Sequence, residues 1–263
     1  MSEPRDHVVE LRDVQLEFPG KKVLDGISLK VEPLDRLVIM GQSGSGKSTI
    51  LRLILGILQP TAGEIFFKQF EISRLNRRKL QQVRTRIGMV YQYSALLSSR
   101  NVRDNIALPL EELTRKSAAE IDKIVDEKLE LVDMLDSKNQ MPSELSGGMR
   151  KRVSLARALV MDPELILFDE PSAGLDPVIS SVIDELIISL TERSKVTSVI
   201  VTHEMDSAFR IATRMAMLYQ GALIADAKPE QLKKSDDPVV QQFLSGSTKG
   251  PILEGTKDAV ATK

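Results

Sequence analysis

The sequence has 263 residues, of which 42% are hydrophobic, and its net charge is −1 because 36 Lys and Arg residues nearly balance 37 Asp and Glu residues. This balance, with no Trp and few other aromatic residues, argues against a global attraction to nucleic acid and against a base-stacking platform. With no Cys and only two His, the chain excludes disulfides, thiol catalysis and Cys/His zinc sites, so any metal must be held by oxygen.

The N-terminal sequence MSEPRDHVVELRDV lacks the apolar segment of a signal peptide, and no apolar run approaches the roughly 18 residues that a membrane-spanning helix needs. We therefore expect a soluble, cytoplasmic protein. If it works in transport, another polypeptide must supply the path through the membrane.

Short apolar runs rich in β-branched residues predict strands, and helical patterns separate several of them. The clearest helix has apolar residues at helical spacing between residues 178 and 190. This alternation favours an α/β fold with a mostly parallel sheet and helices on both faces. The predicted strands are residues 23–31, 37–40, 64–67, 87–91, 165–168 and 196–202.

A stretch of successive helical patterns without strands breaks this alternation after residue 100. We interpret residues 93–161 as a helical subdomain inserted into an α/β core that consists of residues 1–92 and 162–246. Residues 247–263 are rich in Gly, Thr and Lys and weakly patterned, which predicts a C-terminal tail.

A local run of basic residues lies at residues 73–86. It has the composition of a nucleic-acid or lipid-headgroup patch. A solvated helix face is the favoured interpretation, because most such runs are of that kind.

The sequence GQSGSGKS at residues 41–48 follows a predicted strand and begins a predicted helix, as the phosphate-binding pattern G-x-x-x-x-G-K-[ST] requires. Glycines allow a tight loop whose N–H groups surround phosphate, Lys47 reaches the β- and γ-phosphates, and Ser48 can ligate Mg²⁺. A flexible Gly-Ser turn is the alternative. The residues assigned to the nucleotide are Gly41, Gln42, Ser43, Gly44, Ser45, Gly46, Lys47, Ser48 and Thr49.

Four polar residues at or after the ends of predicted strands are candidates for the chemistry. Asp169 and Glu170 end an apolar strand, where unpaired acids are costly unless they have a cation or a catalytic task. Asp169 fits a partner of Mg²⁺, and Glu170 fits a general base that polarises the attacking water. Gln92 and His203 follow other strands, and ligands bind at the carboxyl ends of parallel strands. We assign Gln92 to Mg²⁺ and the water and His203 to the same site, a loop amide and a structural histidine being the alternatives.

The sequence SELSGGMRKR at residues 143–152 predicts a second anion site. Gly147 and Gly148 let the backbone approach a ligand, and the start of a helix attracts phosphate. Three basic residues follow at positions 150–152. One chain with two phosphate sites requires an explanation.

These motifs, in this order, resemble those of the ATP-binding-cassette (ABC) ATPases, the motor subunits of ABC transporters, over about residues 8–246. The resemblance implies a P-loop NTPase (RecA-like) core with an antiparallel β subdomain, and ATP and Mg²⁺ as ligands. It also implies that two cassettes pair head to tail as a homodimer, so that the Ser-Gly-Gly of one covers the γ-phosphate on the P-loop of the other. The motifs carried over are Walker A at residues 41–48, Gln92 of the Q-loop, the signature at residues 145–149, Walker B at residues 165–169, Glu170, the D-loop from Ser172 to Asp176, and the switch His203.

Two further positions differ from the residue that is commonest in the family or match it only in type. Phe18 stands where the family places an aromatic residue that stacks on adenine. Met149 departs from the usual Gln of the signature, and Met cannot donate the hydrogen bonds of an amide. Because Ser146, Gly147 and Gly148 are intact, we expect activity to survive.

Further stretches resemble the ATPase of Mla-type transporters, in which a multipass permease and an MCE-domain lipid-binding protein help to move phospholipid between the inner and outer membranes. They are MPSELSGGMRKRVSLARAL, YQYSALLSSRNVRDNIALPLEE, DEPSAGLDPV and DDPVVQQFLSG. This resemblance implies a peripheral protein on the cytoplasmic side of the inner membrane. A small regulatory subunit, the transported lipid and the direction of transport stay open.

Other functions remain as alternatives. Other ABC transporters, for lipoprotein release or small solutes, are one class, and ABC ATPases of DNA repair or translation are another. The second class usually has a coiled coil, a second cassette or basic extensions, and the sequence shows none of these patterns. For the contact with a permease, the resemblance implies the segment at residues 93–110, with Ala95, Leu96 and Leu97 as candidates or, alternatively, as internal packing.

Overall fold

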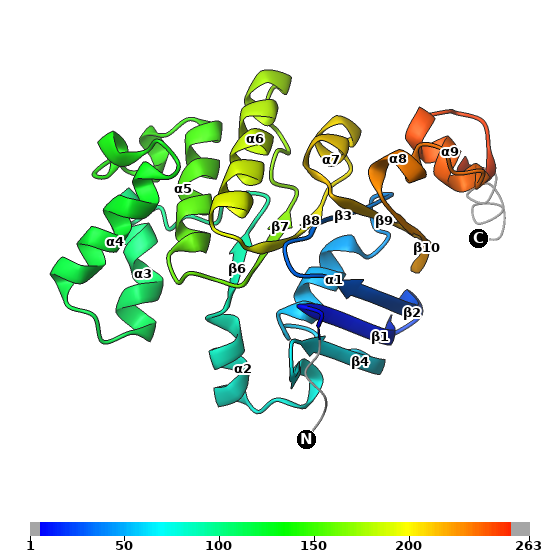
Figure 1. Ribbon diagram of the computed structural model, residues 1–263, viewed down its shortest axis with the longest axis horizontal. Helices are drawn as coiled ribbons and strands as arrows, with labels where there is room; N and C mark the ends of the chain where they lie inside the picture. The colour runs from blue at the N-terminus through cyan, green and yellow to red at the C-terminus, as the bar shows by residue number, and fades with distance from the viewer. Residues whose placement is uncertain (1–5, 254–263) are drawn as a thin grey trace.

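The computed structural model describes residues 6–253 (Figure 1). Its elements are, in chain order, β1 (Val9–Phe18), β2 (Lys21–Val31), β3 (Arg36–Gly41), α1 (Lys47–Ile54), β4 (Ala62–Phe67), β5 (Phe70–Glu71), the 3₁₀ helix η1 (Ile72–Arg74), α2 (Arg77–Arg84), β6 (Ile87–Val90), α3 (Val102–Leu113), α4 (Ala118–Glu130), η2 (Leu135–Ser137), η3 (Pro142–Glu144), α5 (Gly147–Leu159), β7 (Leu165–Asp169), α6 (Pro177–Arg193), β8 (Thr197–Val201), α7 (Met205–Ile211), β9 (Arg214–Tyr219), β10 (Ala222–Ala227), α8 (Pro229–Leu232) and α9 (Pro238–Ser245).

The strands form two sheets. Over the described residues, one sheet has six strands in the order β10-β9-β3-β8-β7-β6, and all neighbours are parallel except β9 and β10. The other has four strands in the order β2-β1-β4-β5 and is antiparallel. The α/β class with a mostly parallel sheet and an antiparallel β part is therefore confirmed.

The central strand β3 is buried on both faces, and its alternating residues enter two different cores. Leu37 and Ile39 pack in a cluster with α1 and the antiparallel sheet. Val38 and Met40 pack in a second cluster with α5 and α6. Because successive side chains of a strand point to opposite faces, the near-continuous apolar sequence of β3 suits this central position. The strand ends at Gly41, where the phosphate-binding pattern begins.

The segment without strands has the predicted helical character. Helices α3, α4 and α5 pack against one another at one end of the molecule (green in Figure 1), and α5 also packs against β6 and α6. Their buried side chains belong to the same apolar cluster as one face of the parallel sheet. The division into a core at residues 1–92 and 162–246 and an insert at residues 93–161 stays a proposal.

Four strands were not predicted, namely β1, β9, β10 and the two-residue β5. In β1 the buried residues shift from Val9 and Leu11 to Val14 and Leu16, because a bulge at Asp13, with φ 47°, interrupts the alternation. Strands β9 and β10 are rich in Met, Leu and Ala rather than in β-branched residues, so propensity alone does not reveal them.

The helix predicted between residues 178 and 190 is longer, and its apolar stripe is not wholly internal. Val178 is 71% exposed and Ile179 is 37% exposed, whereas Ile183, Ile187 and Leu190 are buried. The first turn of α6 therefore presents apolar side chains to the surface.

The remaining expectations concern the surface. The basic run forms η1 and α2, and its residues 77–79 are exposed, as on a solvated helix face. Part of the predicted tail, residues 254–263, lies outside the described residues. Between residues 6 and 253, no helix has both the length and the apolar character that crossing a membrane requires.

Candidate functional site

The phosphate-binding sequence forms a loop between β3 and α1 at the edge of the parallel sheet. Gly41 has φ 150°, and a Cβ there would lie 2.1 Å from the carbonyl oxygen of Leu218, so no other residue fits. Gly46 caps α1 with φ 105°, a backbone conformation that favours glycine. The loop borders a cavity of about 970 Å³.

Lys47 closes this loop upon itself. Its Nζ donates to the carbonyl oxygens of Gly41, at 2.8 Å, and Gln42, at 2.9 Å. Burial lowers the pKa of Lys47, and attraction to Glu170 and Asp169 opposes that effect. Ser45 Oγ is buried with no hydrogen-bond partner within the described chain. A cation and an unused hydroxyl at a glycine-rich loop suit a phosphate group.

Two oxygen-bearing side chains meet at the start of α1. Ser48 Oγ donates to Asp169 Oδ1 at 2.7 Å, which joins the loop to the end of β7. Gln92, two residues after β6, lines the cavity beside them. Hydroxyl, carboxylate and amide oxygens are ligands that Mg²⁺ accepts together with water and phosphate. The donor set therefore fits that ion.

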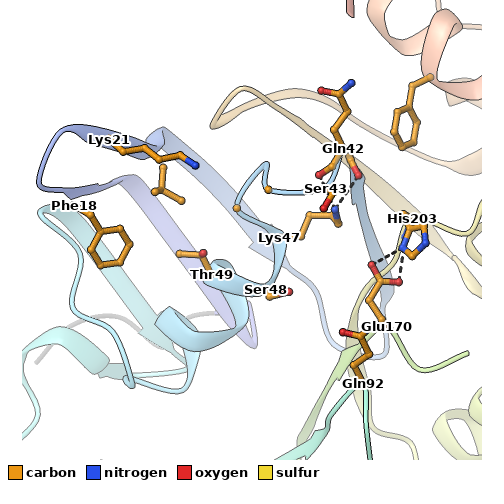
Figure 2. Close-up of a pocket in the computed structure, with 15 residues that line it drawn as sticks. Phe18, Lys21, Gln42, Ser43, Lys47, Ser48, Thr49, Gln92, Glu170 and His203 are labelled. Atoms are coloured by element: carbon orange, nitrogen blue, oxygen red, sulfur yellow. Dashed lines mark hydrogen bonds and ion pairs between the residues drawn. The ribbon is translucent and has the colours of Figure 1, made fainter. Parts of the chain in front are cut away.

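Glu170 and His203 lie on the other side of the loop (Figure 2). His203 Nδ1 lies 2.9 Å from Glu170 Oε1, and the His203 backbone N–H donates to Glu170 Oε2 at 3.3 Å. Glu170 has φ 50°, in the left-handed region that a non-glycine residue rarely adopts. Such strain is common at functional sites, and here it follows directly after β7.

These residues share one edge because of the parallel topology. β3, β7 and β8 are neighbours in the sheet with β6 beside β7, and Gly41, Gln92, Glu170 and His203 come at or just after their carboxyl ends. The structure thus brings together the residues that the sequence analysis placed at strand ends.

Phe18 and several residues that the sequence analysis did not identify also line the cavity. Phe18, predicted to contact adenine, ends β1 and is 45% exposed, and Lys21 of β2 lies beside it (Figure 2). Val23 and Phe243 also line the cavity. Phe243 comes from α9, within the stretch DDPVVQQFLSG, but nothing in that stretch indicates a place in the cavity, because only the fold carries this helix to the site. Lys21 stands three residues after Phe18, and this closeness to the predicted adenine contact could have identified it from the sequence.

The second anion motif lies outside this cavity. Ser146 is the N-cap of α5, and its Oγ accepts a hydrogen bond from the Met149 N–H at 3.2 Å. Of the described residues that line the cavity, none belongs to the signature at residues 145–149. Asp176 is likewise an N-cap, since its Oδ1 accepts from the N–H groups of Val178 and Ile179.

The two signature glycines also have a packing reason. A Cβ on Gly148 would lie 2.9 Å from Ile179 Cγ2, and one on Gly147 would lie 3.2 Å from Leu175 Cδ2. A Cβ at either glycine would therefore require a neighbouring side chain at or just before the start of α6 to shift.

The three basic residues after the signature do not form a free anion site. Arg150 donates to the Leu145 carbonyl oxygen and Lys151 to that of Gln92, both at 2.5 Å, and Arg152 donates to the Val132 carbonyl oxygen and pairs with Asp133. Each of the three residues thus has a partner within the chain, and Lys151 is also buried, so they are not a free cluster of cations.

Together, these groups provide donors for phosphate, oxygen ligands for Mg²⁺ and a carboxylate next to both. Such a site can bind a nucleoside triphosphate and polarise a water for attack.

Comparison with known proteins gives three kinds of match. A sequence model of the ABC transporter family matches residues 24–173. The chain is 40% identical to the intermembrane phospholipid transport system ATP-binding protein MlaF of Haemophilus influenzae, over 94% of this chain and 93% of that protein. It is 39% identical to the probable ribonucleotide transport ATP-binding protein mkl of Mycobacterium leprae, over 95% of this chain and 72% of that protein.

The fold also matches a solved structure. The dimeric ATP-binding cassette MJ0796, bound to ADP and Pi in a post-hydrolysis state, has a TM-score of 0.76 and 31% identity. The match covers 84% of this chain and 98% of that one.

Proposed function

Because this chain belongs to the ABC transporter family, we propose that it is the ATP-hydrolysing subunit of a complex that moves phospholipid between two membranes. The chain is an ABC-type ATPase. The observation that carries the phospholipid assignment is the 40% identity to MlaF along nearly the whole of both chains. The similarity to mkl supports ribonucleotide transport as the alternative, over a smaller share of that relative.

In this proposal, the residues at the cavity bind the ATP phosphates and activate the water that attacks the γ-phosphate. Lys47 would exchange its bonds to the Gly41 and Gln42 carbonyl groups for phosphate oxygens, and Ser48, Asp169 and Gln92 would hold Mg²⁺. When bound there, Mg²⁺ would supply charge neutralisation for the phosphates. Glu170 takes the proton of the attacking water, and His203 holds the Glu170 carboxylate in place.

We further propose that two copies pair head to tail, so that Ser146, Gly147 and Gly148 of one copy complete the phosphate site of the other. The placement of the signature outside the chain's own cavity supports this arrangement, as does the dimeric cassette MJ0796. The exposed Val178 and Ile179 beside Gly148 provide apolar surface at the same place.

A groove of about 300 Å³ suits a permease helix. It is lined by apolar side chains from both sides of the Q-loop segment, among them Tyr91, Ala95, Pro109 and Leu113. Leu97 is 41% exposed, whereas Leu96 packs against the helical core. We therefore keep Ala95 and Leu97 as contact candidates and assign Leu96 to internal packing.

The rest of the proposed complex follows from the resemblance to Mla-type transporters. The chain lies peripherally on the cytoplasmic side of the inner membrane, beneath a permease, with an MCE-domain lipid-binding protein as a further partner. Phospholipid is the transported substrate and is not bound by this chain.

Reconstitution tests the proposal. The chain, co-purified with its permease and MCE-domain partner in liposomes, should drive ATP-dependent transfer of fluorescent phospholipid to acceptor liposomes. The double variant Ala95→Asp and Leu97→Asp should lose both co-purification and transfer. Leu135→Asp is the matched control, because Leu135 is an exposed leucine that does not line this groove. ATP-dependent ribonucleotide uptake without phospholipid transfer would favour the alternative.

A further inference from the structure

Lys151 is a buried cation that none of the site assignments uses. It lies on α5, is 5% exposed, and its Nζ donates to the carbonyl oxygen of Gln92 at 2.5 Å and to that of Glu170 at 3.3 Å. These carbonyl groups belong to two of the residues assigned to Mg²⁺ and to the attacking water. One side chain therefore connects α5 to both.

Lys151 is the first of three donors on one face of α5. Ser154 Oγ donates to the Ser94 carbonyl oxygen at 3.1 Å, and Arg157 donates to those of Ser94 and Ala95, both at 2.7 Å. The spacing of three residues places these donors along a single helix face. They hold the backbone that follows Gln92 from one side.

The backbone held in this way is strained. Ser94 has φ 60° and Ala95 has φ 49°, and Glu170 has φ 50°. Non-glycine residues stay in the left-handed region only where surrounding contacts hold them there. Of the three donors of α5, Lys151 alone reaches Glu170 as well as the Q-loop.

The surroundings suit an ammonium group. Burial lowers the pKa of Lys151, and the charges of Glu204, Glu170 and Asp169 oppose this effect. The cation thus lies among the carboxylates of the site, where a neutral side chain of the same length loses both the attraction and the donors.

We propose that Lys151 is a positioning residue that holds the Gln92 and Glu170 backbones in place relative to the signature end of α5. Ser146 and Lys151 lie on one helix, little more than one turn apart. In the composite dimer, Ser146 faces the partner's ATP while Lys151 holds groups of its own chain's site. A movement of the signature end then displaces the backbone of the chain's own Gln92 and Glu170 through the hydrogen bonds of Lys151. This last step rests on the proposed dimer, whereas the positioning role does not.

Hydrogen–deuterium exchange of the nucleotide-free full-length chain tests the positioning role directly. Lys151→Met should raise the exchange rate of peptides covering residues 91–97 and 169–173 by about fivefold or more, since local opening becomes easier. Lys151→Gln keeps two N–H donors and should restore most of the protection. Arg152→Met is the matched control, because the neighbouring Arg152 bonds to Val132 and Asp133 instead.

Steady-state kinetics supply the second readout. Lys151→Met should lower kcat for ATP at least about tenfold while KM changes less than about threefold, because the P-loop itself is untouched. Lys151→Gln should recover a large part of kcat, and Arg152→Met should match the wild type. Unchanged exchange in both peptides of Lys151→Met overturns the proposal. So does faster exchange throughout the chain that Lys151→Gln fails to reverse, which would show a general structural role. Neither readout depends on which substrate is transported, so a failure of the phospholipid assignment leaves this test intact.

Discussion

At the scale of single residues, the contacts of Glu170 explain how one carboxylate is prepared for its role. His203 bonds to both of its oxygens, and the left-handed backbone at Glu170 directs the side chain toward the P-loop cavity (Figure 2). Asp169, one residue earlier, points instead to Ser48. The two adjacent acids therefore bond to different partners, Asp169 to Ser48 and Glu170 to His203, because successive side chains of a strand point in opposite directions.

Replacement of Glu170 by Gln tests this division of roles. The amide keeps the shape of the side chain but cannot accept a proton, so kcat should fall by roughly 10²-fold or more. ATP binding, measured by equilibrium titration, should stay near the wild-type value, and the variant should accumulate as an ATP-bound dimer. Near-normal hydrolysis would contradict the assignment.

A second residue-scale prediction concerns pH and Glu164, which precedes β7. A hydrogen bond from Arg86 lowers the pKa of Glu164, burial opposes this, and Lys68 lowers it further. Because this pKa is lower in the folded state, the ionised Glu164 stabilises the protein at pH values above the ordinary glutamate pKa of about 4.3. This stabilisation is lost as the pH falls through the pKa of the folded state.

Glu164→Gln should therefore reduce the free energy of unfolding at pH 7, by about 0.5–1 kcal/mol after allowance for solvent screening at this partly exposed site. The difference from the wild type should shrink as pH falls below about 4. Urea unfolding across this pH range is the measurement. The exposed Glu130 of α4 is the control position, and a difference that is the same at every pH would refute the linkage.

At the scale of elements, close packing of α5 decides the geometry of the site. α5 lies against β6 at Gly88, where a Cβ would be 2.5 Å from the Ala158 carbonyl oxygen. The same helix carries the signature at its start and Lys151 one turn later. The distance between α5 and β6 therefore sets whether Lys151 reaches the Gln92 carbonyl group.

Gly88→Ala should push α5 away from β6, because the nearest atom is backbone and cannot rotate aside. We expect a loss of about 1–3 kcal/mol in the free energy of unfolding, typical of overpacking, together with reduced ATP turnover. Chemical denaturation and ATPase assays on the same preparation check both. Met89→Leu, at the next position in β6, conserves volume and should cost less than about 1.5 kcal/mol. Wild-type stability of Gly88→Ala would show that α5 has freedom to move.

At the scale of the whole molecule, the chain carries two halves of different sites. The P-loop and Glu170 border one cavity, and the signature lies apart from it at the start of α5. Mixed dimers of damaged chains distinguish a composite site from a self-contained one. Lys47→Ala disables a P-loop, and Ser146→Arg blocks a signature by its bulk.

A dimer of one Lys47→Ala chain and one Ser146→Arg chain should retain one whole site, because both lesions fall in the same composite site. A doubly substituted chain paired with a wild-type chain should retain none. Occluded ATP per dimer is the measurement, since one intact site can bind without turning over. One ATP in the first dimer and none in the second is expected, and the reverse pattern would show that each chain completes its own site.

The sequence by itself determined the parts of this protein whose chemistry is local. A glycine-rich loop, a strand that ends in two acids and a Ser-Gly-Gly helix start each have a physical reason within a few residues, so residues 41–48, Asp169 and Glu170 were assigned without a structure. Apolar runs rich in β-branched residues likewise predicted the central strands and the parallel sheet.

Only the tertiary structure decided the features that depend on distant segments. Phe243 lines the cavity because the chain returns to it after β10, and Lys151 faces Gln92 because α5 packs on β6. In the sequence, Lys151 stands between two other basic residues, and the pattern of charges alone does not distinguish its role from theirs. Burial and partners distinguish them, and both arise from packing between elements that no local pattern records.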